Sequence, residues 1–216
     1  MQDCLYPDEL ECGLDESGCG PMMGDLYCAG VILPPTCPYE ECREQWDMLN
    51  DSKKVSKKKR DKLFDFIKEV AIDYSIQTVS VEDIDRDNIF ASRCNGFHKV
   101  IKNLSLKPTQ LIVDGTAFKA YYDEEGEIIP HVCIKRGDEK YRNIAAASIL
   151  AKVARDRYVE KLHEEYPEYN WIKNKGYGTK QHLEAIKENG ITKYHRKTFG
   201  ICKTWRELPD KNLKSC

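Results

Sequence analysis

The stretch IAAASILAKVA, residues 144–154, constrains the fold of this 216-residue chain more than any other feature. It forms the N-terminal half of a helix predicted over Arg142–Tyr166, and Pro167 ends that helix because proline cannot continue the hydrogen-bond pattern. Small apolar side chains let a helix backbone pack closely on an apolar surface, so we expect a β-sheet beneath it. Strands alternate with helices along the rest of the chain, which predicts an α/β class with a mixed sheet flanked by helices.

Short apolar runs predict the strands of that sheet. Two runs within Cys12–Leu33 flank a glycine-rich segment, which predicts a hairpin with a tight turn. Leu111–Asp114 and His131–Ile134 are typical of short buried strands, and Tyr74–Val81 is a further strand with Ile76, Val79 and Val81 as expected core positions. The other expected helices are Ser56–Ile72 with Ser56 as N-cap, Val81–Leu104, and Thr179–Asn189 with Gly190 as its C-terminal glycine.

Length and composition fit an ordinary globular protein. The chain is 41% hydrophobic and 32% charged, and its length suits one domain or one domain with a modest appendage. No window approaches ~18 consecutive apolar residues, which argues against a transmembrane helix. The segment Met1–Cys12 lacks the basic start and apolar stretch of a secretory signal peptide, so we expect a cytoplasmic location.

The ten cysteines are many for this length. Without an export signal, reduced thiols are the expected state. The chain has no C-x-x-C pair, and Cys37 and Cys42 have no histidine nearby that would complete a zinc site. We therefore expect plain thiols, many of them buried as small hydrophobic side chains.

Four acids lie where an α/β sheet would place a site. Asp15 and Glu16 end the first apolar run, Asp114 ends the strand LIVD, and Asp138 precedes the long helix. Carboxylates at the ends of buried strands suit hard cations such as Mg²⁺ or Mn²⁺, and two such ions suit phosphodiester hydrolysis. Neighbours on a regular strand face opposite ways, so Asp15 and Glu16 share a cluster only if the chain bends there. The other interpretation is that these are capping, turn and surface acids.

A basic run, SKKVSKKKRDK over residues 52–62, contains seven cations and one acid. One interpretation is a solvated helix start. The other is a patch that contacts phosphates. The net charge of −2 does not decide between them.

The motifs around these residues resemble the ribonuclease HII family, in matching order over about residues 12–203. The segment Gly13–Leu33 is similar to the family's opening, where an Asp-Glu pair precedes a Gly-Arg-Gly turn and a second strand. Leu49–Arg60 resembles its Asp-Ser-Lys-Lys segment, and Ile112–Gly115 its third-acid strand. Further matches are KRGDEKYRNIAAASILAKVARDRY (135–158), KGYGTKQH (175–182) and YHRKTFGICK (194–203).

This resemblance implies an RNase H-like fold with a C-terminal helical segment. It implies an N-terminal extension over 1–11, a catalytic domain over 12–203 whose helical part begins near 160, and a tail over 204–216. Asp15, Glu16, Asp114 and Asp138 take the metal and catalytic roles, with the first three as principal ligands. The implied activity is Mn²⁺- or Mg²⁺-dependent hydrolysis of RNA in RNA–DNA hybrids. It includes nicking 5′ of a ribonucleotide embedded in duplex DNA, with 5′-phosphate and 3′-hydroxyl ends, by a protein expected to be a monomer.

The resemblance also implies substrate contacts. Tyr177 matches the tyrosine that stacks on the sugar beside the ribonucleotide. The backbone of the Gly18–Cys19–Gly20 turn matches the segment that reads the 2′-hydroxyl. The phosphate contacts it implies are Ser52, Lys53, Lys54, Lys152 and Arg155.

Cys19 departs from the family pattern, because it occupies the position of the turn's arginine. Cysteine offers no charge-assisted donor, so a phosphate contact or a local ion pair is lost. We expect weaker binding or weaker single-ribonucleotide selectivity, with hydrolysis retained.

Three alternatives stay open. A type 1 ribonuclease H, or another member of the same broad fold, is disfavoured by the adjacent Asp15–Glu16 pair and by the alanine-rich helix after the fourth acid. The type 3 relative usually carries an extra N-terminal domain, whereas about a dozen residues precede the first strand here. A catalytically weakened hybrid-binding protein has Cys19 as its only support.

Overall fold

The computed structural model describes residues 1–50 and 55–205. Its centre is a five-stranded sheet in the order β3-β2-β1-β4-β5. The first two strands form the predicted hairpin, β2 also pairs antiparallel with β3, and β4 runs parallel to both β1 and β5. The mixed sheet expected from the sequence is confirmed. The strands are β1 (Glu11–Ser17), β2 (Leu26–Ile32), β3 (Asp73–Val79), β4 (Gln110–Asp114) and β5 (His131–Ile134).

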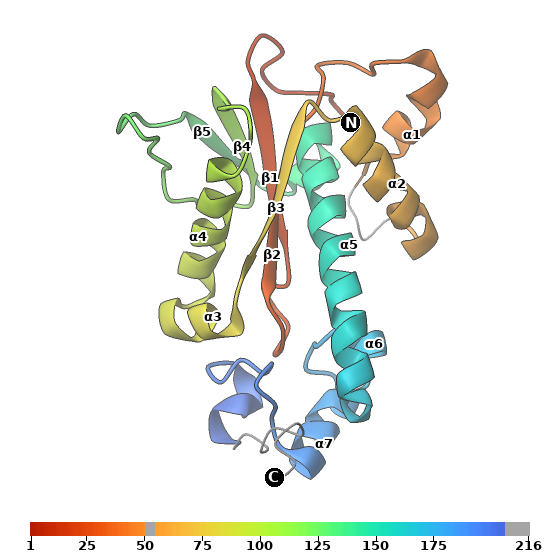
Figure 1. Cartoon of the computed structure of the whole chain (residues 1–216), viewed down its shortest axis with the longest axis vertical. Helices are drawn as coiled ribbons and strands as arrows, with labels where there is room; N and C mark the ends of the chain where they lie inside the picture. Colours follow the sequence, from red (N-terminus) through yellow and green to blue (C-terminus); the bar gives the residue numbers. More distant parts are fainter. Residues whose placement is uncertain (51–54, 206–216) are drawn as a thin grey trace, which may run out of the picture.

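Helices cover both faces of this sheet. Figure 1 shows α3 and α4 on one side and α2 and α5 on the other. The α-helices are α1 (Arg43–Met48), α2 (Lys57–Val70), α3 (Val81–Asp87), α4 (Ile89–Lys102), α5 (Arg142–Glu165), α6 (Trp171–Asn174) and α7 (Lys180–Asn189). The 3-10 helices are η1 (Glu40–Cys42), η2 (Gly137–Glu139), η3 (Pro167–Tyr169) and η4 (Gly200–Thr204).

Helix α5 lies as close to the sheet as its small side chains predicted. Ala145, Ala146 and Ala147 are fully buried. A Cβ atom on Gly13 of β1 would lie 2.3 Å from the backbone carbon of Asn143 at the start of α5, so only glycine fits that strand position. This close packing fixes where β1 ends relative to α5.

The predicted helix Val81–Leu104 is wrong as one element. The chain breaks at Asn88, whose φ of +68° interrupts the helical backbone between α3 and α4. The Asn88 side chain accepts hydrogen bonds from the N–H groups of Phe90 and Ala91, both at 3.1 Å, and so caps α4. Ser56 does precede α2 as predicted, although its side chain makes no capping hydrogen bond.

The C-terminal elements form a separate apolar cluster beyond the end of the sheet. Figure 1 shows α6, α7 and the following segment beside the connection between β1 and β2. Met22 and Met23 of that connection are buried among Val159 of α5, Trp171 of α6 and Ile186 of α7. The expected C-terminal helical segment is therefore present, and it covers the β1–β2 turn.

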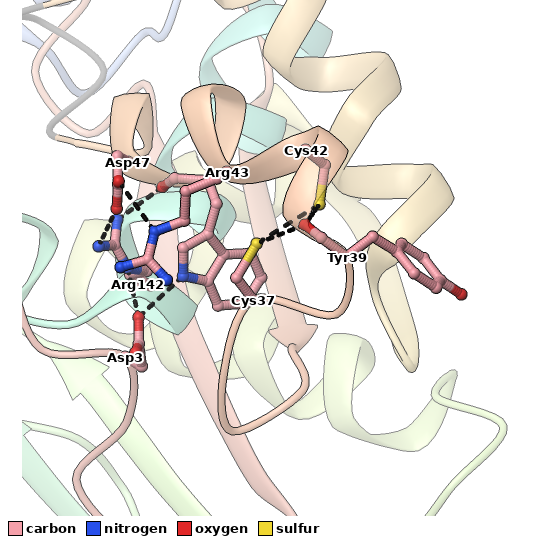
Figure 2. A network of polar contacts seen from close by, with 8 residues as sticks. Asp3, Cys37, Tyr39, Cys42, Arg43, Asp47 and Arg142 are labelled. Atoms are coloured by element: carbon pink, nitrogen blue, oxygen red, sulfur yellow. Dashed lines mark hydrogen bonds and ion pairs between the residues drawn. The ribbon is translucent and has the colours of Figure 1, made fainter.

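The N-terminal segment is tied to α1 and α5 by a charged network (Figure 2). The guanidinium of Arg142, in the first turn of α5, donates to Asp3 Oδ1 at 2.5 Å and to Asp47 Oδ1 at 2.9 Å. The same view shows Cys37 and Cys42, whose Sγ atoms are 3.5 Å apart. Both are free thiols, as are the other cysteines within the described residues. Among these residues, none of the helices has the length and apolar character needed to cross a lipid bilayer.

Candidate active site

A pocket of about 370 Å³ lies where β1 and β4 end. These strands are parallel neighbours, with Leu14 opposite Val113, so the residues that follow, Asp15 and Asp114, lie side by side where β4 ends and β1 continues for two more residues. The structure brings together the four predicted acids, the glycine turn, Lys152 and Tyr177. The lining residues are Asp15, Glu16, Ser17, Gly18, Cys19, Gly20, Asp114, Asp138, Ser148, Lys152 and Tyr177.

Asp15 is the most deeply placed acid on β1. Its side chain is only 6% exposed and lies on the α5 side, where it hydrogen-bonds to Ser148. Its Oδ1 accepts a hydrogen bond from the Glu16 N–H at 2.7 Å. Burial raises the pKa of Asp15 well above its usual value, and the negative charges of Glu16 and Asp114 raise it further. A divalent cation would relieve both effects.

The bend expected at Asp15 and Glu16 lies further along the chain. Strand β1 stays paired through Ser17, and the first unusual backbone angle is at Gly18, with φ of +110°. Asp15 and Glu16 therefore face opposite sides of the sheet, as neighbours on a strand must. Both nevertheless line the pocket, which lies where the pairing of β1 with β4 stops.

Glu16 lies on the α4 side and both of its carboxylate oxygens are engaged. Arg93 of α4 donates through Nε to Oε2 at 2.8 Å, and the two side chains are 12% and 16% exposed. The Cys19 thiol donates to Oε1 at 3.2 Å. Burial, followed by the charge of Glu16, raises the pKa of Cys19, so the thiol keeps its proton and acts as a donor.

Arg93 is a site residue that sequence reasoning missed. Besides Glu16 it donates to the carbonyl oxygen of Ala117 at 3.1 Å and to that of Asp114, and so ties β1 to the end of β4. It occupies an ordinary position on an amphipathic helix, 77 residues from Glu16. Nothing in the local sequence indicates that contact.

The remaining two acids meet through the backbone of η2. The Gly137 N–H donates to Asp114 Oδ1 at 2.7 Å, which places Asp138, 8% exposed, beside the end of β4. The donor set of carboxylates fits a hard divalent cation. As the side chains stand, no group of three or more His, Cys, Asp or Glu residues within 1–50 and 55–205 is arranged to hold an ion. Both oxygens of Glu16 are engaged by Arg93 and Cys19.

The glycine turn after β1 is closely surrounded. A Cβ on Gly18 would lie 2.4 Å from Arg155 Nε, and one on Gly20 would lie 3.2 Å from the ring of Tyr177. Tyr177 is half exposed, so its ring borders both the turn and solvent. Arg196 is a second residue that sequence reasoning missed: it is fully buried and donates to the carbonyl oxygen of Gly18 at 2.7 Å.

The predicted phosphate contacts have different outcomes. Lys152 lines the pocket and pairs with Asp156 at 2.7 Å. Arg155 is 1% exposed and donates to the carbonyl oxygens of Met23 and Lys175, and its phosphate contact stays a prediction. Its side chain packs against the turn at Gly18. Ser52, Lys53 and Lys54 lie outside the described residues.

Two buried histidines hold the loop that carries Tyr177. His182 Nδ1 lies 3.0 Å from the Tyr177 carbonyl oxygen, so this nitrogen carries the proton, while Nε2 accepts from the Trp171 indole at 3.0 Å. His195 Nδ1 accepts from the Thr192 N–H at 2.9 Å, which leaves its Nε2 proton facing His182 Nε2 at 3.3 Å. Both rings are neutral, and burial lowers the pKa of His182 and lowers that of His195 to about 3.

Comparison with known proteins places this arrangement in context. Residues 12–202 match the family model described as Ribonuclease HII. A protein of that description from Bacteroides thetaiotaomicron is 45% identical over 197 residues, which cover 91% of this chain and 92% of the relative.

Two solved structures are similar in fold. The ribonuclease H2 from Pyrococcus horikoshii OT3 has a TM-score of 0.73 and 25% identity over 89% of this chain and 95% of its own. Bst-RNase HIII in complex with Mn²⁺ has a TM-score of 0.65 and 16% identity over 94% of this chain and 72% of its own. These likenesses confirm the RNase H-like fold.

Proposed function

The chain belongs to the ribonuclease HII family and is a ribonuclease H, an endonuclease that acts on RNA–DNA hybrids. On this premise we propose that it hydrolyses the RNA strand with two divalent ions and also nicks 5′ of single ribonucleotides embedded in duplex DNA. The products would carry 5′-phosphate and 3′-hydroxyl ends. The catalytic unit would be residues 12–203, acting as a monomer.

One observation carries this proposal: a single pocket is lined by four carboxylates, by a glycine turn and by an exposed tyrosine. The carboxylates provide ligands for hard cations. The turn and Tyr177 provide a backbone surface and an aromatic surface for a sugar. A pocket with only the acids would support metal binding without any preference for a nucleic acid.

Asp15, Glu16 and Asp114 would hold the ions as principal ligands, and Asp138 would complete the site. The solved structure of Bst-RNase HIII, which contains Mn²⁺, supports a metal of this kind. When bound, Mg²⁺ or Mn²⁺ activates water and stabilises the leaving oxygen. Glu16 would reach an ion by giving up part of its contact with Arg93 or Cys19.

The substrate would lie across the pocket with its ribose against the turn. Tyr177 would stack on the adjoining sugar, since its ring lies 3.2 Å from where a Cβ on Gly20 would be and half of the residue is exposed. Lys152, at the pocket wall, would face a backbone phosphate. Ser52, Lys53 and Lys54 would extend these contacts along the strand.

The test compares cleavage of a duplex containing one ribonucleotide with cleavage of an all-RNA hybrid strand, in Mn²⁺ or Mg²⁺. We expect Asp15→Asn and Asp114→Asn each to reduce the rate by about a thousandfold or more on both substrates. Glu124→Gln, an exposed acid outside the pocket, is the matched control. Wild-type protein that cuts the hybrid and leaves the single ribonucleotide intact would remove the nicking half of the proposal.

A second candidate is a hybrid-binding protein with weakened catalysis, supported by Cys19 in the turn. The same assay separates the two. Tight binding of the hybrid by wild-type protein, with no cleavage in either metal, favours the binding protein.

A further inference from the structure

Arg196 makes an unusual set of contacts with the turn after β1. Its side chain is fully buried, and it donates to the carbonyl oxygens of Gly18 at 2.7 Å, Cys19 at 3.2 Å and Pro21 at 2.9 Å. Two further hydrogen bonds, at 3.0 and 2.7 Å, reach the carbonyl oxygen of Gly24. The planar guanidinium therefore fixes four peptide groups of one short segment.

These contacts determine where the N–H groups of the turn are directed. In a planar trans peptide, the carbonyl of one residue and the N–H of the next are directed to opposite sides. The carbonyls of Gly18 and Cys19 face Arg196, so the N–H groups of Cys19 and Gly20 face away from it. That side is the pocket, which Gly18, Cys19 and Gly20 line while Arg196 does not. Within the described part of the chain, neither N–H group has a backbone hydrogen-bond partner.

The charges near the turn also favour an anionic or polar oxygen as the partner of these N–H groups. Arg196 and its neighbour Arg155 are both buried, and neither has an ion pair among the described residues, although the charges of Asp25 and Asp85 act on Arg196. Burial, followed by the nearby charge of Arg155, lowers the pKa of Arg196 to about 10, so the guanidinium stays protonated at neutral pH. Two cations thus lie beneath a turn whose own side chain, Cys19, is uncharged.

We propose that Arg196 is a positioning residue for substrate recognition: by binding the carbonyls of Gly18 and Cys19, it presents the N–H groups of Cys19 and Gly20 as paired donors to an oxygen of the ribose-phosphate backbone. This inference rests on the proposed function, because the ligand is the nucleic acid. It extends that function by assigning the geometry of the turn to a residue 178 positions away. Arg196 touches no reacting atom.

The experiment uses Arg196→Lys, which keeps a positive charge and loses the planar set of five donors. We expect KM for the single-ribonucleotide duplex to rise about tenfold, as for the loss of a charge-assisted hydrogen bond, with a smaller change in kcat. Mn²⁺ affinity, measured by calorimetry without nucleic acid, stays within about twofold of wild type, since Arg196 does not line the pocket. Arg142→Lys is the matched control, another buried arginine distant from the turn.

A second measurement does not depend on Arg196→Lys folding. In the full-length Asp15→Asn protein, the amide proton resonances of Cys19 and Gly20 should shift downfield when the ribonucleotide duplex binds. A matched all-DNA duplex identifies the ligand atom: shifts with both duplexes indicate a phosphate oxygen, and shifts with the ribonucleotide duplex alone indicate the 2′-hydroxyl.

The outcomes separate this inference from the proposed function. Wild-type protein that cleaves neither substrate overturns both. Wild-type cleavage together with an unchanged KM for Arg196→Lys, or with unshifted Cys19 and Gly20 amides, overturns the role of Arg196 alone.

Discussion

Two buried arginines, Arg142 and Arg196, have their charged side chains stabilised by different kinds of partner. Arg142 lies at the start of α5 between the carboxylates of Asp3 and Asp47, as Figure 2 shows. Arg196 lies beneath the turn after β1 and binds only carbonyl oxygens. The first arrangement neutralises its charge and joins three segments of the fold. The second satisfies every donor with carbonyl oxygens and pairs the guanidinium with no carboxylate by direct contact among the described residues.

The difference separates structural charges from functional ones. A buried ion pair is costly to break, yet it produces little field outside itself because its charges cancel. Carbonyl dipoles solvate a cation without cancelling it, so its field extends to a nearby anionic ligand. In the C-terminal elements, buried Arg196, His182 and His195 are likewise bound by neutral partners. Each of the following predictions tests this contrast.

Acid should loosen the C-terminal elements through His195. Its pKa of about 3 in the folded protein lies below the ordinary value of 6.5, so the unfolded chain binds the proton more readily between these values. The stabilisation is complete above pH 6.5 and is lost as pH falls. We expect the free energy of unfolding to drop by about 2 kcal/mol at pH 5 and about 4 kcal/mol near pH 3.5 from this residue.

Urea unfolding at several pH values measures this loss. His195→Asn, whose amide oxygen can still accept from the Thr192 N–H, should flatten the slope between pH 6.5 and 4. An unchanged slope in that variant would assign the acid sensitivity to other groups.

Replacing Arg142 should affect stability and leave recognition intact. Arg142→Met removes hydrogen bonds to Asp3, to Asp47 and to the Trp46 carbonyl oxygen, and we expect a loss of about 2–3 kcal/mol in the free energy of unfolding. Urea unfolding measures the loss, and KM below the unfolding transition should match wild type. A raised KM in the folded variant would mean that both arginines serve the substrate, and the contrast would fail.

The sequence indicated those parts of the site that depend on local pattern. Asp15, Glu16 and Asp114 were predicted as site residues because each lies at the end of an apolar run, and all three line the pocket. The small residues of α5 predicted its close packing on the sheet. The break at Asn88 had a local signal, an N-cap residue before an apolar helix, which helical periodicity outweighed. Arg93 and Arg196 had none. The partner of Arg93 lies 77 residues away, and those of Arg196 lie up to 178 residues away. The sequence around an arginine does not indicate whether its side chain contacts solvent, a carboxylate or a carbonyl oxygen.

Arg93 offers an intermediate case, a partly buried arginine paired with one carboxylate of the proposed metal site. It neutralises part of the acid cluster and occupies Glu16 Oε2, so it competes with an ion for that carboxylate. We expect Arg93→Met to bind Mn²⁺ about fivefold more tightly, a difference of about 1 kcal/mol. The thermal stabilisation by Mn²⁺ should then exceed that of wild type. Weaker binding in the variant would instead identify Arg93 as an orienting partner of Glu16.

The smallest effect is expected from restoring an arginine in the turn. Cys19→Arg adds a cation at the pocket wall, where one new phosphate contact would steepen the salt dependence of binding by about one unit. Because Arg93 already pairs with Glu16 and Arg196 already places positive charge beneath the turn, we expect affinity for the single-ribonucleotide duplex to rise by about threefold at moderate salt. Unchanged affinity and unchanged junction selectivity would remove the expectation that Cys19 weakens recognition. A gain in affinity of about a hundredfold would show that direct contact between an exposed guanidinium and a phosphate outweighs the field of buried Arg196.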